Sequence, residues 1–261
     1  MADLGALLRN LTDELDALDA IVAGLDDDGW ATPTPAAGWD VRDSISHLAG
    51  SDAAALRAVS EPDGFAARLP QIAADPDAWV HADVERGRAM TIADVLAWWR
   101  AGRARMLDAF AALDPAQRIP WFGPPMGAAS FVTARLMETW AHGQDVVDGL
   151  GVRREPTHRL RHVADIGVRT RGFSYLLRGR SAPDVPVRVE LTAPDGGVWT
   201  WGPDDAVDRV EATALDFCLL VTQRRHRDDV DVRTTGDAAA EWLAIAQAFA
   251  GLPGPGRSRL A

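Results

Sequence analysis

The sequence predicts a chain in two parts, an N-terminal four-helix bundle followed by a small α+β domain. Two observations support this division. Long amphipathic segments with helical spacing fill the first 150 residues, whereas strand-like alternation occurs only after them. The charge changes at the same place, since the first 150 residues hold 11 Arg against 23 acidic residues and the rest hold 16 Arg against 15.

The boundary between the two parts is placed near residues 150–156. Gly149 and Gly151 can end a helix there, and Pro156 can open the next one. The predicted regions are therefore two domains and a Pro- and Gly-containing tail that we expect to be disordered, at 1–152, 153–252 and 253–261.

Four segments of the first part have the spacing of amphipathic helices. In the first of them, apolar residues recur every three or four positions. The third opens on Thr91 and Asp94, which resemble a capping box. Between the helices, residues 61–90 form a Pro- and Gly-containing insert with room for one short helix, and residues 120–127 are predicted to be irregular. The four predicted helices span 4–25, 40–59, 91–113 and 129–149.

The second part mixes helices with strands. Residues 187–192 alternate between apolar and polar side chains, as in a half-buried strand. Asp195 and Gly196 then form a hairpin-turn signal. The predicted strands span 185–193, 198–202 and 229–234, and the predicted helices span 157–178, 211–224 and 237–250.

Composition excludes several classes of chemistry. The formal charge of −11 argues against a nucleic-acid or anionic-membrane partner. The chain contains no lysine, so lysine nucleophiles, Schiff bases and the lysine-containing phosphate loop are excluded. The single cysteine, Cys218, lies in an apolar run and excludes an intramolecular disulfide and an all-thiolate metal site. With no signal-peptide pattern and no apolar run of membrane-spanning length, we expect a cytoplasmic protein.

Three side chains of the first part have the types and spacing of a metal site. Glu138 and His142 are four residues apart on a predicted helix, so both lie on one face. His47 lies between two apolar residues of another predicted helix and is expected to face inward. Two imidazoles and a carboxylate with room for one further ligand are typical of a catalytic zinc site. The alternative is that the Glu–His pair is an ordinary solvated helix face.

Other candidates are weaker or open. His158 and His162 are also four residues apart, but flanking arginines favour a solvated basic face. Arg224 and Arg225 precede His226 at a predicted helix end. There they either complement the helix dipole or bind a carboxylate or phosphate, and both interpretations remain open. The predicted substrate contacts are Trp39 and Trp121, in loops near the expected ligands, and Asp145, one turn after His142.

Two sequence patterns in the first part resemble the DinB-like metal-binding superfamily. They are residues 38–48 (GWDVRDSISHL) and 138–145 (ETWAHGQD), and the nearest branch is the mycothiol-dependent maleylpyruvate isomerase type. Residues 216–226 (DFCLLVTQRRH) resemble the small α+β domain called wyosine base formation. Together they are similar to an actinobacterial family of metal-binding proteins with this domain order.

The resemblance implies a bundle in which His47, Glu138 and His142 hold a divalent metal ion. Zinc is the expected ion, with nickel, iron or manganese as alternatives. In the isomerase branch the metal activates a low-molecular-weight thiol, mycothiol, and an arginine of the second domain faces the metal. That arginine corresponds here to Arg224 or Arg225. One departure is that many DinB-like proteins use three histidines, where this chain has Glu138.

Three functions are compatible with these residues. The first is a metal-dependent enzyme that uses an external thiol to isomerise, or transfer to, a small carboxylated electrophile. The second is a hydrolase that uses a metal-bound water, and the third is a non-enzymatic module that binds a metal or an acyl ligand. The expected partners are a small-molecule substrate and a thiol, without nucleic acid or membrane, and the expected state is a monomer or weak homodimer.

Overall fold

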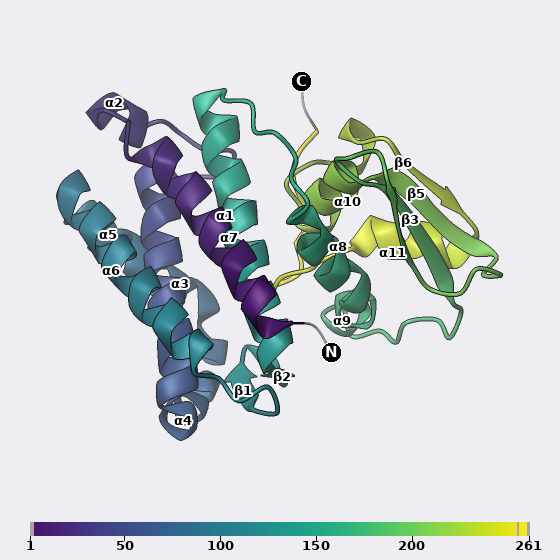
Figure 1. The fold of residues 1–261 in the computed structure, drawn as a ribbon, viewed down its shortest axis with the longest axis horizontal. Coiled ribbons are helices and arrows are strands. Elements are labelled where there is room, and N and C mark those ends of the chain that lie inside the picture. The colour runs from purple at the N-terminus through teal and green to yellow at the C-terminus, as the bar shows by residue number, and fades with distance from the viewer. Residues whose placement is uncertain (1–2, 255, 260–261) are drawn as a thin grey trace. The chain divides into compact units, whose positions relative to one another are not determined.

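The computed structural model describes residues 3–254 and 256–259, and Figure 1 shows its elements. The chain divides into two compact units, Met1–Arg154 and Glu155–Ala261. The predicted disordered tail lies partly outside the described residues, and its described positions contain no helix or strand.

Four long helices form the core of the first unit, which confirms the predicted bundle. Helix α3 packs against α6 and α7, and α1 packs against α7 and α6, so the four helices enclose one core (Figure 1). Their bounds are α1 Leu4–Val22, α3 Val41–Ser60, α6 Ile92–Ala111 and α7 Ala128–Leu150.

Helix α1 follows its predicted apolar stripe but ends earlier than expected. Leu11, Leu15 and Leu18 are buried along the stripe, whereas at its start Leu7 is buried in place of Leu8. The helix ends at Val22 because Asp26 caps a separate short helix, α2 (Asp27–Trp30), where its carboxylate accepts a hydrogen bond from the Gly29 backbone N–H.

The prediction of a largely irregular insert at 61–90 was wrong. The structure has two helices there, α4 (Pro62–Ala74) and α5 (Pro76–Arg88). Both prolines occupy the first helical position, where the missing N–H costs nothing. The Asp75 carboxylate, which accepts a hydrogen bond from Ala78 N at 3.0 Å, caps the second helix.

Helix α5 lies very close to α3 because two glycines remove side chains from the contact. A Cβ atom added at Gly50 would lie 2.0 Å from an Asp83 carboxylate oxygen, and one added at Gly87 would lie 1.8 Å from Ser46 Oγ. Both contacts are within a turn of His47, so α5 packs tightly against the part of α3 that carries that residue.

The prediction that residues 120–127 are irregular was also wrong. Strands β1 (Arg118–Trp121) and β2 (Gly123–Gly127) form a two-stranded antiparallel hairpin. Gly123 makes the turn with a φ of 135°, a region closed to most other residues. Proline is compatible with such a hairpin because each strand has a free edge.

The second unit is a four-stranded mixed sheet with helices packed on it, as the small α+β prediction requires. The strand order is β4-β3-β5-β6, in which only β3 and β5 run parallel. The strands are β3 Val187–Thr192, β4 Val198–Trp201, β5 Asp208–Thr213 and β6 Val232–Thr235. The helices are α8 Leu160–Arg169, α9 Arg171–Leu176, α10 Ala214–Val221, η1 Arg227–Asp229 and α11 Asp237–Ile245.

Strand β5 is the main element that the sequence did not predict. A helix was expected to begin at residue 211, but residues 208–213 pair with β3 on one side and β6 on the other. The helix α10 starts only after Thr213, whose hydroxyl accepts a hydrogen bond from Asp216 N. The predicted helix 157–178 is likewise divided into α8 and α9 at Thr170.

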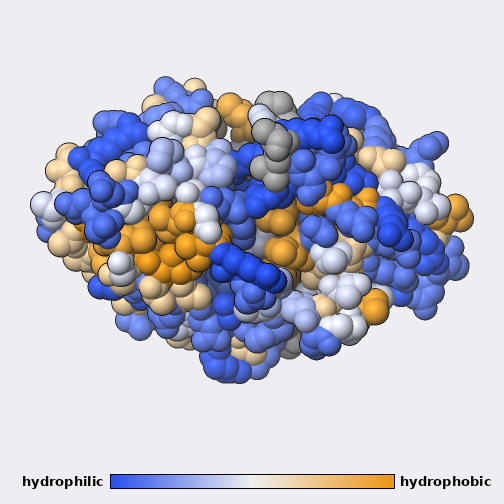
Figure 2. Space-filling model, turned by 90° about the horizontal axis from the view of Figure 1, so that it is seen from above, coloured by the Kyte–Doolittle hydropathy of each residue, from blue (hydrophilic) through white to orange (hydrophobic). Residues whose placement is uncertain are grey.

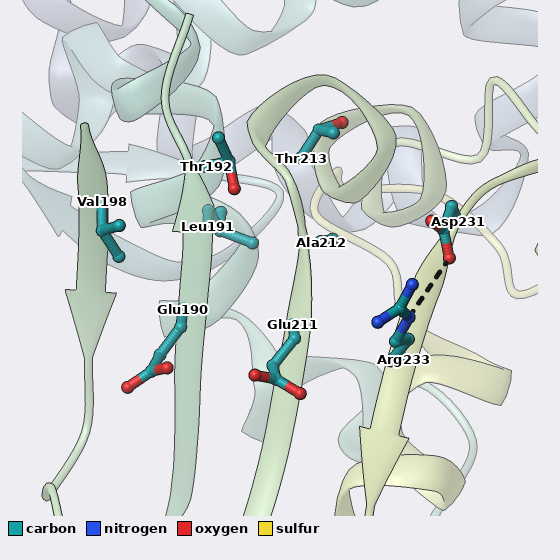
Figure 3. A pocket seen from close by; sticks show the side chains of 9 residues that line it. All are labelled: Glu190, Leu191, Thr192, Val198, Glu211, Ala212, Thr213, Asp231 and Arg233. Atoms are coloured by element: carbon teal, nitrogen blue, oxygen red, sulfur yellow. Dashed lines mark ion pairs between the residues drawn. The ribbon is translucent and has the colours of Figure 1, made fainter. Parts of the chain in front are cut away.

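The sheet has one covered and one open face. Helices α10 and α11 pack on the covered face, where Val189, Leu191 and Val210 are buried. A hollow on the open face brings Glu190 and Glu211 side by side from neighbouring strands (Figure 3). Beyond them Arg233 is paired with Asp231 at 3.7 Å, and both side chains are largely exposed (Figure 3). The open face is therefore solvated and of mixed charge.

The surface has the character that the composition predicts. The face in Figure 2 is mostly hydrophilic, with hydrophobic residues gathered in separate patches. Within residues 3–254 and 256–259, no helix combines the length and the hydropathy that crossing a bilayer requires.

Candidate metal centre

Helix α3 carries His47 into the bundle. The helix starts at a reciprocal capping box in which Asp43 N donates to the Asp40 carboxylate at 2.8 Å and Asp40 N donates to the Asp43 carboxylate at 3.3 Å. These bonds fix the first turn of the helix, and His47 lies one turn further on. Its exposed fraction is only 9%. Its Nε2 atom lies 3.5 Å from Ser51 Oγ.

Helix α7 presents Glu138 and His142 on one face, as their spacing predicts. Glu138 Oε2 lies 3.5 Å from His142 Nε2, and the two side chains are 22% and 12% exposed. Both are therefore largely shielded from water but still reachable from outside the bundle.

The three predicted ligands converge. One donor atom each from His47, Glu138 and His142 lies within 4.8 Å of the others, and the two imidazole centroids are 4.5 Å apart. Ligand atoms about 2.0–2.1 Å from one tetrahedral ion would be separated by about 3.3 Å, so small side-chain movements would bring these donors into range. Two imidazole nitrogens and one carboxylate are also a donor set that zinc and similar divalent ions accept.

The charge state of Glu138 suits a ligand. Burial by itself would raise the pKa of this carboxyl. The hydrogen bond and charge of His142, together with the positive charges of Arg135 and His47, outweigh burial and lower the pKa to about 2. Glu138 is therefore ionised near neutral pH, as metal coordination requires.

The second nitrogen of His142 faces another carboxylate. His142 Nδ1 is buried, and no hydrogen-bond partner for it is found among the described residues. The Asp145 carboxylate lies 3.7 Å away and is 1% exposed on the helix turn that follows. Imidazoles that bind metals usually donate their other N–H to a carboxylate of this kind. The substrate contact predicted for Asp145 stays a prediction, and its burial favours a role behind the ring.

A buried ion pair next to Glu138 was missed by the sequence analysis. Arg135 Nη2 donates to Asp52 Oδ1 at 2.8 Å, and the two side chains are 2% and 1% exposed. Arg135 precedes Glu138 by one turn, and its charge is one of those that lower the pKa of that carboxyl. No sequence signal joins two residues 83 positions apart, so only the fold reveals this pair.

Trp39 lies against both histidines. Its ring centroid is 5.2 Å from that of His47 and 6.0 Å from that of His142, and it is stacked on the latter. Arg88 of α5 holds this loop in place, because Nη2 donates to Gly38 O at 3.1 Å while the same guanidinium pairs with Asp43. A substrate contact of Trp39 stays a prediction, which its position beside the two histidines suits. Sequence reasoning missed Arg88.

Trp121 belongs to a cluster of aromatic rings on the β1–β2 hairpin. It stacks on Phe65 with centroids 5.5 Å apart and meets Phe131 edge-on at 5.0 Å. Phe122 joins the cluster and contacts Trp79 of α5. These contacts explain why the hairpin packs on the bundle, and a substrate contact of Trp121 stays a prediction.

Arg224 and Arg225 follow the end of α10. Arg224 is 9% exposed, and its Nη1 donates to Thr222 O at 2.7 Å. Arg225 Nη1 donates to Arg224 O at 2.8 Å. The role of either arginine in holding a substrate carboxylate stays a prediction.

Two family models match the chain. The model for the mycothiol maleylpyruvate isomerase N-terminal domain matches residues 11–147, which is more than half of the chain. The model for wyosine base formation matches residues 183–235. The first match contains all three candidate ligands, and the second contains Arg224 and Arg225.

Similar proteins and structures agree with these matches. Two uncharacterized proteins of Mycobacterium tuberculosis, from strains CDC 1551/Oshkosh and ATCC 25618/H37Rv, are each 48% identical over 98% of this chain and 100% of their own length. Crystal structures of the mycothiol-dependent maleylpyruvate isomerase and of a histidine-to-alanine mutant match with a TM-score of 0.58. They cover 88% of this chain and 92% of theirs at 14% identity, so they show a common fold.

Proposed function

The chain belongs to the mycothiol maleylpyruvate isomerase N-terminal domain family, and from this premise we propose that it is a metal-dependent enzyme that uses an external low-molecular-weight thiol. The observation that supports this most strongly is the convergence of His47, Glu138 and His142 from two helices. Three protein ligands are the number that catalytic zinc sites use, whereas structural sites use four.

The residues of the chain have distinct parts in this proposal. A divalent ion held by the three ligands would supply the charge that lowers the pKa of a thiol, so that thiolate is available near neutral pH. His47, Glu138 and His142 hold that charge in place, and Asp145 orients the His142 ring. Trp39 shields the centre from water on one side.

The proposed reaction is isomerisation of, or transfer to, a small carboxylated electrophile. A thiolate that adds to an activated double bond allows rotation about the resulting single bond, and its departure restores the double bond. Arg224 or Arg225 would hold the carboxylate through a forked pair of hydrogen bonds. Mycothiol is the thiol named for the related isomerase, and we propose the same class of thiol here.

Elemental analysis and a thiol-dependence assay test this function together. We expect about one divalent ion per chain and turnover of an unsaturated dicarboxylate only when a mycothiol-class thiol is added. Absence of thiol-dependent turnover, together with metal-dependent cleavage of an ester or amide, would identify a hydrolase that activates water at the same ligands. Absence of stoichiometric metal would instead indicate a non-enzymatic binding module.

The thiol of the protein itself is a poor candidate for this chemistry. Cys218 has an exposed fraction of 0%, and burial raises the pKa of its thiol well above the usual range. Its Sγ atom lies 3.5 Å from Leu160 O. These observations support an external source for the reacting thiol.

Cys218 should therefore be inert towards an aromatic disulfide reagent in the folded protein. We expect labelling to be at least about 100-fold slower than in the urea-unfolded chain, because the thiolate is neither formed nor accessible. The single cysteine makes the absorbance readout unambiguous. Rapid labelling of the folded protein, or loss of thiol-dependent turnover in Cys218→Ser, would contradict this.

Asp145→Asn should weaken metal binding without unfolding the protein. The change keeps the shape of the side chain but removes the charge that faces His142 Nδ1, and loss of such a partner typically lowers metal affinity by about 10–100-fold. Competition with a chromogenic chelator measures the affinity. Asp148→Asn, the same change one turn later on α7, is the matched control, and equal affinities for the two variants would exclude this role for Asp145.

A further inference from the structure

Four arginines line a small cavity in the second unit. Its volume is about 90 Å³, and it lies where α10 ends. The arginines of the lining are Arg178, Arg225, Arg227 and Arg257, and His226 lies among them. The remaining lining residues are apolar, glycine or glutamine, and none of the residues that line the cavity is acidic. In a chain of net charge −11, such a concentration of arginine is unexpected.

An unusual turn at the end of α10 positions the lining residues Gln223 and Arg225. Helix α10 ends in a motif in which Arg224 N donates to Leu219 O at 2.7 Å and Gln223 N donates to Leu220 O at 2.9 Å. Gln223 occupies the left-handed position of this motif with a φ of 58°, which is normally taken by glycine. It is the one non-glycine residue with positive φ in the part of the chain that the structure describes.

The glutamine side chain connects the turn to the opposite wall. Gln223 Nε2 donates to Ala246 O at 3.1 Å, so the turn is bound to the segment that follows α11. Glycine would adopt this backbone conformation with less strain but would lose that bond. Gln223 therefore keeps a backbone conformation that favours glycine, and its side-chain amide joins the turn to Ala246 on another part of the lining.

Backbone carbonyls orient two of the arginines of this cavity. Arg178 Nη1 donates to Ser174 O at 3.2 Å, and Arg227 Nη2 donates to Val232 O. A carbonyl is neutral, so it fixes the direction of a guanidinium without cancelling its charge. The helix dipole accounts for cations near the ends of α9 and α10. It does not account for Arg227 and Arg257, which come from η1 and from the C-terminal segment.

We propose that this cavity is a binding site for a tetrahedral oxyanion of the phosphate class. A phosphate group carries a charge of about −1.5 to −2 and three strong acceptor oxygens, which several guanidiniums can share, whereas a carboxylate offers one charge and two oxygens. A volume of about 90 Å³ suits one such group, since pockets for whole drug-sized ligands span about 300–1,000 Å³. The ligand is inorganic phosphate or the phosphate group of a small metabolite.

This site goes beyond the proposed thiol chemistry and is built wholly from the second unit. Arg225 lines this site and Arg224 does not. If Arg225 binds phosphate, Arg224 is the preferred candidate for binding the substrate carboxylate. Arg178 and Arg257, which the sequence analysis did not single out, belong to the site.

Isothermal titration of the full chain with inorganic phosphate tests the proposal. We expect saturable binding to one site, and Arg227→Gln and Arg178→Gln should each weaken it at least about tenfold, as loss of a charge-assisted contact does. Arg257→Gln should have the same effect and cannot unfold a helix or strand, because Arg257 lies outside all of them. The matched control is Arg233→Gln, an exposed arginine on the open sheet face (Figure 3), which should leave binding unchanged.

Two further titrations separate this site from the metal centre and define its ligand. Phosphate should still bind to His142→Ala with unchanged affinity, which excludes coordination to a metal ion. A phosphate monoester that binds more tightly than phosphate would identify a metabolite as the ligand, and equal affinity would identify the free ion. Failure to saturate at millimolar phosphate, or equal weakening in Arg233→Gln, would overturn the proposal.

Discussion

His142→Ala should leave the bundle folded and remove its bound metal ion. Two remaining ligands rarely hold a divalent ion, so we expect affinity to fall by more than about 100-fold and thiol-dependent turnover to disappear. Alanine is a strong helix former, and the substitution introduces no buried charge, so circular dichroism should be unchanged. Elemental analysis after gel filtration measures the bound ion directly.

His81→Ala is the control for that change. His81 is an exposed histidine of α5 whose Nδ1 atom contacts Asp77 O at 2.7 Å, so its loss removes an imidazole without touching the three candidate ligands. It should retain about one ion per chain. Retention of one ion by His142→Ala as well would place the metal elsewhere or show that the three side chains do not bind one.

Arg135→Met should produce the largest loss of stability among single substitutions at this centre. It leaves the Asp52 carboxylate buried in the bundle without its cation, and breaking a buried ion pair from one side costs about 3–5 kcal/mol. The free energy of unfolding from urea titrations measures the loss. Replacing both partners, as in Asp52→Leu with Arg135→Met, should recover most of it, because no buried charge then remains.

The stability deficit of Arg135→Met should also depend on pH. Burial already raises the pKa of Asp52 against the opposing charge of Arg135, so removal of Arg135 raises it further. A carboxyl with a raised pKa in the folded state favours folding in its protonated form, so the deficit should shrink as the pH falls and grow as it rises. A deficit that is small and independent of pH, or no recovery in the double variant, would contradict a coupled pair.

Periodicity and local spacing were sufficient to predict the bundle and to single out the three side chains that converge in it. The stripe of α1 and the Thr91 cap of α6 depend on residues within a few positions of one another, and both occur in the structure. Glu138 and His142 follow the same rule. His47 could be proposed because it lies between two inward-facing apolar residues of α3. Convergence of the three side chains follows once the helices pack.

The elements and ion pairs that the sequence analysis missed have a common physical origin. Strand β5 is defined by pairing with β3 and β6, which are distant in sequence, whereas its own residues have no strong strand preference. Pro62 and Pro76 begin α4 and α5, although proline more often interrupts a helical pattern. Two ion pairs join residues that are far apart in the sequence: Asp52 and Arg135 are separated by 83 positions, and Asp43 and Arg88 by 45. No local pattern could therefore distinguish these charged side chains from solvated ones.

The residues just after α7 determine where a fragment that contains only the first unit can end. The first unit continues to Arg154, whose guanidinium pairs with Glu14, a carboxylate with an exposed fraction of 0%. The same side chain donates to Trp140 O at 3.1 Å and lies over the Trp140 ring. A truncated chain that stops at the predicted boundary of 152 would discard this arginine and remove the cation that pairs with the buried carboxylate of Glu14. Spectroscopic work on the metal centre alone should therefore use a fragment that keeps Arg154.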